Sequence, residues 1–160
     1  TVAVELAKLG YRRFVILSCA DYEAGTPVHF SFDARRRGIS EVAQQRGIEL
    51  CEVKTDMAND GFSQIPQLQP LFAPDTAIVA LDMYSTVEFL VELSATQWRA
   101  GIDFGIACCD DYFHDNRLHG ISRVSFNRYQ MGLQAADMML QLLQQPDAEC
   151  SSRMIRGEWV

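Results

Sequence analysis

The sequence predicts an α/β domain in which a mainly parallel βαβ sheet carries helices on both faces. Helical and strand periodicities alternate along the 160 residues, which is the pattern of repeated βαβ units. Two expected strands, 13–17 and 76–81, are continuous apolar runs, as is typical of strands that are buried on both sides. Glycine or proline stands within two residues after most expected helices, where it would end them.

In the first half of the chain, residues 2–9 and 33–45 are the expected helices. Residues 13–17 form the first strand, and the alternation over 48–53 predicts the second. The helices present apolar residues at helical spacing, and these are Val2, Leu6, Leu9, Ile39, Val42 and Ala43. Gly10 and Gly47 are the expected helix ends.

The middle of the chain predicts a short helix, two strands and a longer helix. Apolar residues over 62–68 indicate a helix that the neighbouring prolines keep short. Residues 76–81 form the clearest strand of the chain, and 104–109 form the fourth. Between them, 85–98 has the apolar spacing of an amphipathic helix.

The last third of the chain predicts a strand, a long helix and a final strand. Residues 121–126 alternate as a strand does, and Asn127 can cap a helix over 128–145. That helix has a broad apolar face formed by Met131, Ala135, Met138, Met139, Leu142 and Leu143. Pro146 ends it, and residues 154–160 form the expected last strand.

Composition indicates a single globular domain without a membrane span. The length can bury a core, and no apolar run is long enough to cross a bilayer. The first ten residues lack the pattern of a secretory signal. The net charge of −7 is opposite to that of a free-standing nucleic-acid binder, so any DNA contact is expected from another part of the protein.

The five cysteines are expected to be reduced, structural thiols of a cytoplasmic protein. Their number is odd and no C-x-x-C pair occurs, which argues against both a disulfide framework and a zinc site. Three of them (Cys19, Cys51 and Cys108) lie in or beside apolar runs, where a thiol packs as a small hydrophobic group.

Carboxylates follow the expected strands at their carboxyl ends, where ligands bind in open parallel sheets. They are Asp21, Asp56, Asp82, Asp110 and Asp111. Arg35 begins the first crossover helix on the same side, and an arginine opposite a carboxylate suits a polyhydroxylated ligand because each offers two aligned hydrogen bonds. The alternative is helix capping, which is open to Asp82 and Asp33 because each precedes an expected helix.

Enzymatic and metal-binding interpretations have little support. The chain contains no G-x-S-x-G elbow, no phosphate-binding loop and no G-x-G-x-x-G turn. His29, His114 and His119 are scattered, and only His114 lies near the Asp110–Asp111 pair, so no metal site is expected. Cys108 and Cys109 end a buried strand, where core thiols are expected rather than a nucleophile.

Five motifs in this order resemble the lactose/galactose-repressor (LacI/GalR) family of transcription regulators, whose sensing domain has the type I periplasmic binding protein fold. Residues 6–16 resemble the helix, Gly-aromatic turn and strand that begin the second subdomain of the sensing domain. The other four are Arg35–Ile39 (Arg-x-x-Gly-aromatic), Thr76–Met83 ("TAIFAAND"), Ile106–Asp111 ("IVGFDD") and Ile121–Gly132 ("LTTVRQPxxxMG").

The resemblance implies an effector site at these motifs and no cofactor. Arg35 and Asp110 match family residues that hydrogen-bond the effector, and His29 and Ser31 fall where relatives place polar contacts. Asp82 and Phe126 stand where relatives have Asn and Gln. A carboxylate and a ring in place of two amides imply an effector different from that of well-known relatives. A sugar or sugar derivative is the first expectation, and a planar ligand stacked on Phe126 is the second.

The resemblance also implies a truncated sensing domain. Residues 1–125 would be its C-terminal subdomain, 126–146 a crossover helix that packs on a missing N-terminal subdomain, and 147–160 a return strand. The helix-turn-helix that contacts operator DNA would lie upstream of Thr1. We expect the apolar face of the crossover helix to be covered by a second copy of the chain or repacked onto the sheet.

The implied function is therefore the allosteric sensing of a small effector by a homodimeric, cytoplasmic regulator. One rival is a periplasmic sugar-binding protein of an uptake system, which a signal peptide upstream would support. A further rival is a fragment of an α/β enzyme.

Overall fold

The computed structural model describes residues 1–19, 30–55, 65–111, 120–146 and 152–160. The helices are α1 (Val2–Lys8), α2 (Phe30–Arg46), α3 (Ile65–Leu68), α4 (Met83–Leu93) and α5 (Arg128–Gln144), with a 3-10 turn η1 (Gln69–Leu71). The strands are β1 (Arg13–Cys19), β2 (Glu49–Thr55), β3 (Thr76–Ala80), β4 (Gly105–Cys108), β5 (Ser122–Ser125) and β6 (Glu158–Trp159).

These strands form one sheet in the order β2-β1-β3-β4-β5-β6. All neighbouring pairs are parallel except β5 and β6, which are antiparallel. The chain runs from β1 outward to β2 on one side and then returns to β3 on the other. The strand order therefore reverses between β1 and β3, and in this class of sheet the reversal point is where ligands bind.

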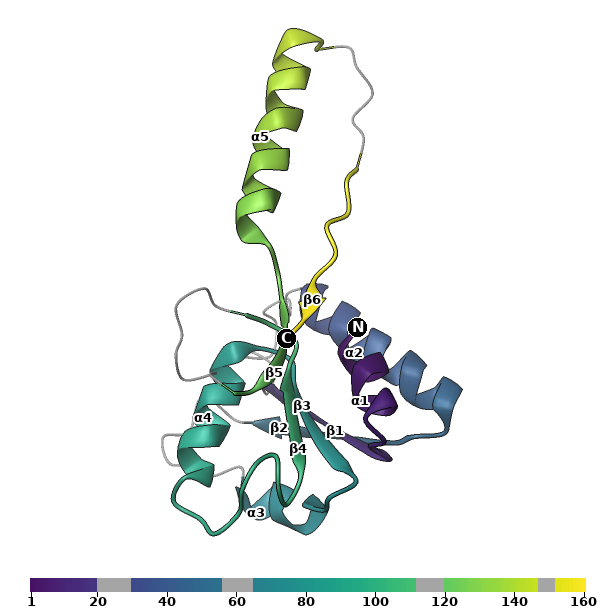
Figure 1. Cartoon of the computed structure of the whole chain (residues 1–160), viewed down its shortest axis with the longest axis vertical. Coiled ribbons are helices and arrows are strands. Elements are labelled where there is room, and N and C mark those ends of the chain that lie inside the picture. The colour runs from purple at the N-terminus through teal and green to yellow at the C-terminus, as the bar shows by residue number, and fades with distance from the viewer. Residues whose placement is uncertain (20–29, 56–64, 112–119, 147–151) are drawn as a thin grey trace.

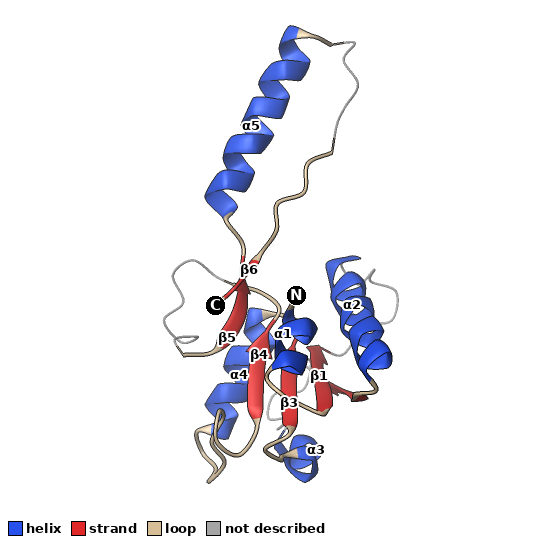
Figure 2. Ribbon diagram, turned by 45° about the vertical axis from the view of Figure 1, so that its right-hand side comes forward, coloured by secondary structure: helices blue, strands red, loops and turns tan. Residues whose placement is uncertain are grey.

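Helices cover both faces of the sheet, as predicted (Figures 1 and 2). Phe14 and Ile16 of β1 pack in one apolar cluster with α1 and α2. Val15 and Leu17 point the other way and pack with α3 and α4. Because successive strand residues face opposite sides and both sides are covered, the central positions Phe14–Leu17 are all apolar. This double burial explains the continuous apolar runs of the sequence.

Two glycines end helices as the sequence predicts. Gly10 and Gly47 follow α1 and α2, with φ of +96° and +63°. Residues with a side chain rarely adopt this left-handed conformation, so glycine is the natural residue for a helix end.

Several expected boundaries are wrong by a few residues. Leu9 lies beyond α1 and is 66% exposed, so it is not part of the buried stripe. The α4 helix ends at Leu93, and there Thr96 Oγ1 donates to the Leu93 carbonyl at 2.8 Å. Asp33 lies inside the first turn of α2 and pairs with Arg36 at 2.9 Å, so it does not cap that helix. The last strand is only Glu158–Trp159.

The α5 helix projects away from the sheet (Figure 1), and none of its residues is buried. Its larger apolar side chains, which are 44–73% exposed, are Tyr129, Met131, Leu133, Met139, Leu140 and Leu143. The expected alternative of repacking onto the sheet is therefore wrong. No helix of the described residues is long and apolar enough to span a membrane.

Candidate functional site

Arg35 extends from the beginning of α2 across the carboxyl edge of the sheet. Its Nη1 donates to the main-chain carbonyl of Leu81, just past β3, at 2.5 Å. Its Nη2 donates to Oδ2 of Asp110, just past β4, at 3.2 Å. The guanidinium carbon also lies 5.9 Å from the centroid of the Phe32 ring. Three contacts therefore hold this side chain at the predicted ligand edge.

Asp110 is shared between two arginines. Its Oδ2 pairs with Arg35, and its Oδ1 accepts from Nη2 of Arg128 at 3.1 Å. The main-chain N–H of Asp111 donates to the same Oδ1 at 2.8 Å. The Asp110 side chain is only 25% exposed, so these charge-assisted bonds are partly shielded from water.

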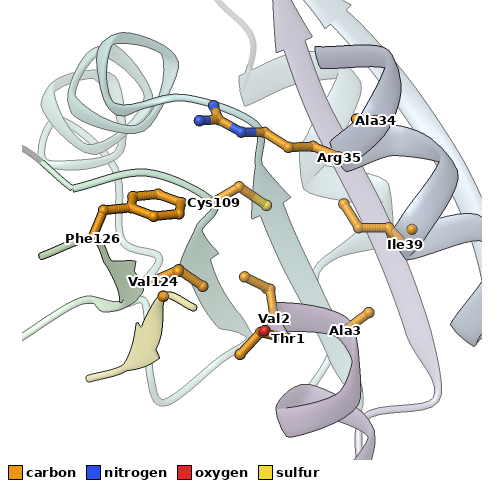
Figure 3. A pocket seen from close by; sticks show the side chains of 11 residues that line it. Thr1, Val2, Ala3, Ala34, Arg35, Ile39, Cys109, Val124 and Phe126 are labelled. Carbon is orange, nitrogen blue, oxygen red and sulfur yellow. The ribbon is translucent and has the colours of Figure 1, made fainter. Parts of the chain in front are cut away.

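A cavity of about 240 Å³ opens beside Arg35 (Figure 3). One side of the cavity is formed by the beginnings of α1 and α2. The other side is formed by the residue after β4 and by residues in or beside β5 and β6. The lining of the cavity consists of Thr1, Val2, Ala3, Ala34, Arg35, Gly38, Ile39, Cys109, Val124, Phe126 and Gly157. Among the described residues, Arg35 is the one charged side chain of a largely apolar lining, so it would orient a ligand while the walls contribute dispersion contact.

Phe126 forms one wall of this cavity, and its ring points inward (Figure 3). The wall is closed by Gly157, which approaches β5 closely. A Cβ atom at Gly157 would lie 2.4 Å from Cγ1 of Val124 and 3.1 Å from the Phe126 ring. Glycine is therefore required here by close packing, since its φ is not in the left-handed region.

Asp82 acts as the N-cap of α4, as the capping interpretation predicts. Its Oδ1 accepts from the main-chain N–H of Ser85 at 2.9 Å, and its Oδ2 accepts from the Ser85 hydroxyl at 2.7 Å. The residue is 7% exposed and does not line the cavity. A contact between Asp82 and the effector stays a prediction.

The structure brings together three of the six predicted site residues: Arg35 and Asp110 are paired, and Arg35 and Phe126 line one cavity. Ser31 lies in the first turn of α2, outside the cavity lining. His29 falls outside the described residues, as do Asp21, Asp56, His114 and His119.

Three residues of this edge were not singled out as site residues from the sequence. Arg128 contacts Asp110, Phe32 lies near the Arg35 guanidinium, and Cys109 lines the cavity. Arg128 directly follows the helix cap Asn127, and this position in the sequence does not predict that its side chain contacts Asp110. Phe32 could have been inferred, because it is three positions from Arg35 and therefore on the same side of a helix.

Cys108 and Cys109 are buried thiols without a disulfide partner, and Cys51 is a partly buried one. Burial raises the pKa of Cys108 from 9.0 to about 11 and that of Cys109 to about 12. Because the thiolate is the reactive form, both thiols are poor nucleophiles at neutral pH. The prediction that they are core thiols is confirmed.

In the part of the chain that the structure describes, no group of three or more His, Cys, Asp or Glu side chains is arranged to hold a metal ion. The charged groups of the edge are instead paired with one another. Besides the two pairs of Asp110, Arg123 Nε contacts Oδ1 of Asp111 at 3.0 Å. The arrangement supplies fixed hydrogen-bond donors and acceptors, which suits ligand binding.

Residues 3–160 match the family model described as a periplasmic binding protein-like domain. No curated protein matches the chain.

Solved structures that share this fold include two LacI regulators and a Lac repressor. The LacI transcriptional regulator from Lactobacillus brevis is 18% identical, with a TM-score of 0.73 over 98% of this chain and 58% of its own. A LacI family transcriptional regulator from Arthrobacter sp. FB24 in complex with lactose is 14% identical, with a TM-score of 0.77 over 99% and 60%. A dimeric Lac repressor with a C-terminal deletion is 18% identical, with a TM-score of 0.78 over 99% and 57%. The chain thus spans between half and two thirds of each of these proteins.

Proposed function

The chain belongs to the periplasmic binding protein-like domain family, and from this premise we propose that it senses a small effector, a sugar or sugar derivative, as part of a LacI-type transcription regulator. The observation that carries the proposal is the Arg35–Asp110 pair at the carboxyl edge of the sheet, beside a cavity.

The chemistry of the pair suits a ligand that carries several hydroxyl groups. A guanidinium group only donates hydrogen bonds and a carboxylate only accepts them, whereas a hydroxyl does both. The two hydroxyl groups of a vicinal diol can therefore both donate to Asp110 while one of them accepts from Arg35. The Arg35 side chain is 21% exposed and that of Asp110 25%, so both remain accessible to a ligand.

The comparisons support this ligand class and this kind of protein. One structure of the same fold is a LacI family regulator in complex with lactose, and another is a dimeric Lac repressor. For this chain the proposal accordingly includes a homodimer in the cytoplasm. Contact with operator DNA would be made by a helix-turn-helix outside residues 1–160, because the chain itself carries a net charge of −7.

The proposed mechanism is a coupling between two binding equilibria. Residues 1–125 would form one subdomain, 126–146 would cross to a second subdomain, and 147–160 would return. An effector held between the subdomains would change their relative orientation and hence the spacing of paired DNA-binding heads. A coupling free energy of about 1–3 kcal/mol changes operator affinity roughly 5- to 150-fold.

A planar effector is the second candidate, and the wall formed by Phe126 favours it. The ring points into a cavity whose other walls include Val124 and Ile39. A flat ligand would stack on that ring and use Arg35 for orientation.

The deciding experiment uses the intact protein that contains this chain. Operator binding is followed by fluorescence anisotropy while sugars, beginning with lactose, and nucleobases are added. We expect Arg35→Ala and Asp110→Ala to abolish the effector response and leave operator affinity unchanged. Arg37→Ala, from the exposed side of the same helix, is the matched control. An unchanged response in both site variants would refute the site.

Two rival functions have their own tests. A signal peptide encoded upstream of Thr1, in place of a helix-turn-helix, would establish a periplasmic sugar-binding protein with the same site. An enzyme would turn over a member of the ligand panel, whereas the family and the solved structures reported above are binding proteins and regulators.

A further inference from the structure

Arg128 joins the candidate site to the helix that leaves the sheet. It is the first residue of α5, and its Nη2 donates to Oδ1 of Asp110 and to the main-chain carbonyl of Asp111. Asp110 is also the partner of Arg35. A single carboxylate therefore connects α2, the end of β4 and the start of α5.

The Asp110 carboxylate is nearly saturated before any ligand arrives. A carboxylate accepts about four hydrogen bonds. Arg35, Arg128 and the main-chain N–H of Asp111 already provide three. A diol that donates two hydrogen bonds to Asp110 must therefore displace one of these donors.

Arg128 is the donor that can be displaced most easily. Its side chain is 47% exposed, whereas that of Arg35 is 21% exposed. Each arginine also donates to a main-chain carbonyl, Arg35 to that of Leu81 and Arg128 to that of Asp111, but Arg35 in addition lies near the Phe32 ring. The N–H of Asp111 belongs to the main chain and adjoins Asp110, so it cannot leave without moving the strand end.

Loss of the Arg128 contact would destabilise the beginning of α5. The main-chain N–H of Arg128 donates to the Phe126 carbonyl at 2.7 Å, so the same short segment also carries a wall of the cavity. The next turn is held by Asn127, whose Oδ1 accepts from Gln130 N at 3.0 Å and whose carbonyl accepts from Met131 N at 3.0 Å. The exchange rates of these two amides report whether the turn is closed.

We propose that Arg128 is a positioning residue that couples occupation of Asp110 to the first turn of α5. An effector that donates two hydrogen bonds to Asp110 displaces the Arg128 guanidinium, and the turn that begins α5 opens more often. The inference rests on the proposed function, because it takes Asp110 as an effector ligand.

The ligand-free test measures amide hydrogen exchange by NMR on the whole chain. Asp110→Ala and Arg128→Gln should each accelerate exchange at Gln130 and Met131 about two- to fivefold, the size expected for loss of a half-exposed ion pair. Acceleration in the double variant should stay below the product of the two single effects, since both substitutions remove the Asp110–Arg128 contact. Arg128→Lys should restore part of the protection.

Arg123→Gln is the matched control, because Arg123 pairs with Asp111 at 3.0 Å on the same edge of the sheet. It should leave the two reporter amides unchanged. Unchanged exchange in Arg128→Gln, or equal acceleration in Arg123→Gln, would overturn the coupling.

A second measurement adds lactose as the probe. Where lactose binds, exchange at Gln130 should rise toward the rate of the Asp110→Ala variant, and bound lactose without that rise overturns the coupling. If lactose does not bind, that result counts against the proposed ligand class, and the ligand-free variants alone decide the role of Arg128.

Discussion

The Arg35 guanidinium donates to the main-chain carbonyl of Leu81 at 2.5 Å, which joins the first crossover helix to the end of β3. Leu81 itself is fully buried. The bond thus serves the fold as well as the site: it satisfies a carbonyl at the strand reversal and holds the guanidinium beside the cavity.

This bond predicts a loss of stability in Arg35→Gln. Removal of the donor leaves a buried carbonyl without this partner, so the free energy of unfolding should fall by about 1–2 kcal/mol. Urea denaturation followed by circular dichroism measures it. Arg37→Gln removes an exposed arginine from the same helix and should change little. Equal effects of the two substitutions would contradict the role given to the Leu81 carbonyl.

The two interpretations of Asp82 are separable by substitution. Asp82→Ala removes both hydrogen bonds to Ser85 and should lower the free energy of unfolding by about 1–2 kcal/mol. Asp82→Asn retains an acceptor for the Ser85 N–H and should lose less. A variant Asp82→Asn that is stable but has an altered effector response in the intact protein would show that Asp82 also contacts the effector.

The buried thiols predict a loss of stability in alkaline solution. In the unfolded chain the thiols titrate near pH 9, whereas burial raises the pKa of Cys108 to about 11 and of Cys109 to about 12. Above pH 9 the unfolded state therefore binds fewer protons than the folded state, and the free energy of unfolding falls as the pH rises toward 11–12. Below pH 9 this contribution is fully present.

Urea midpoints measured between pH 8 and pH 11 test this dependence. In the double variant Cys108→Ala/Cys109→Ala, the urea midpoint should fall less between pH 8 and pH 11 than it does in the unsubstituted protein. Each protein is compared with its own midpoint at pH 8. The comparison isolates the thiols from tyrosine and lysine, which titrate in both proteins. Parallel pH profiles of the two proteins would contradict the assignment.

Close packing at Gly157 predicts a costly substitution. In Gly157→Ala the new methyl group would meet Val124 at 2.4 Å, so β5 or β6 must shift, at a cost of about 1–3 kcal/mol. Gly132→Ala in α5 is the control, because a Cβ there meets nothing within 4 Å and alanine favours a helix. Thermal unfolding should show opposite signs for the two variants, and equal effects would contradict the packing argument.

The exposed apolar side chains of α5 predict self-association. Each large side chain that becomes covered contributes roughly 1.5–3 kcal/mol, so a second copy of the chain should cover them at high concentration. Sedimentation velocity should show a dimer that Leu143→Glu weakens. Gln141→Glu adds the same charge to the helix at an already polar position and should leave association nearly unchanged. A monomer at high concentration would rule out the prediction.

Local patterns in the sequence predicted most of the fold. Apolar period, helix-ending glycines and an Asn cap located the helices and strands of the described residues, with errors of up to five residues at their ends, because these signals depend on neighbours along the chain. The end of α4 was predicted too far along the chain. There the hydroxyl group of Thr96 donates to the carbonyl of Leu93 and competes with the helical hydrogen bonds.

The sequence by itself also identified Arg35 and Asp110 as ligand-edge residues, since strand ends of a parallel sheet share one edge and a family motif marks both positions. Only the tertiary structure decided that one Asp110 carboxylate serves both Arg35 and Arg128, and that Cys109 and Gly157 line the same cavity. The physical reason is that these contacts depend on strand order and register, which join residues far apart in the chain and leave no periodic trace in the sequence.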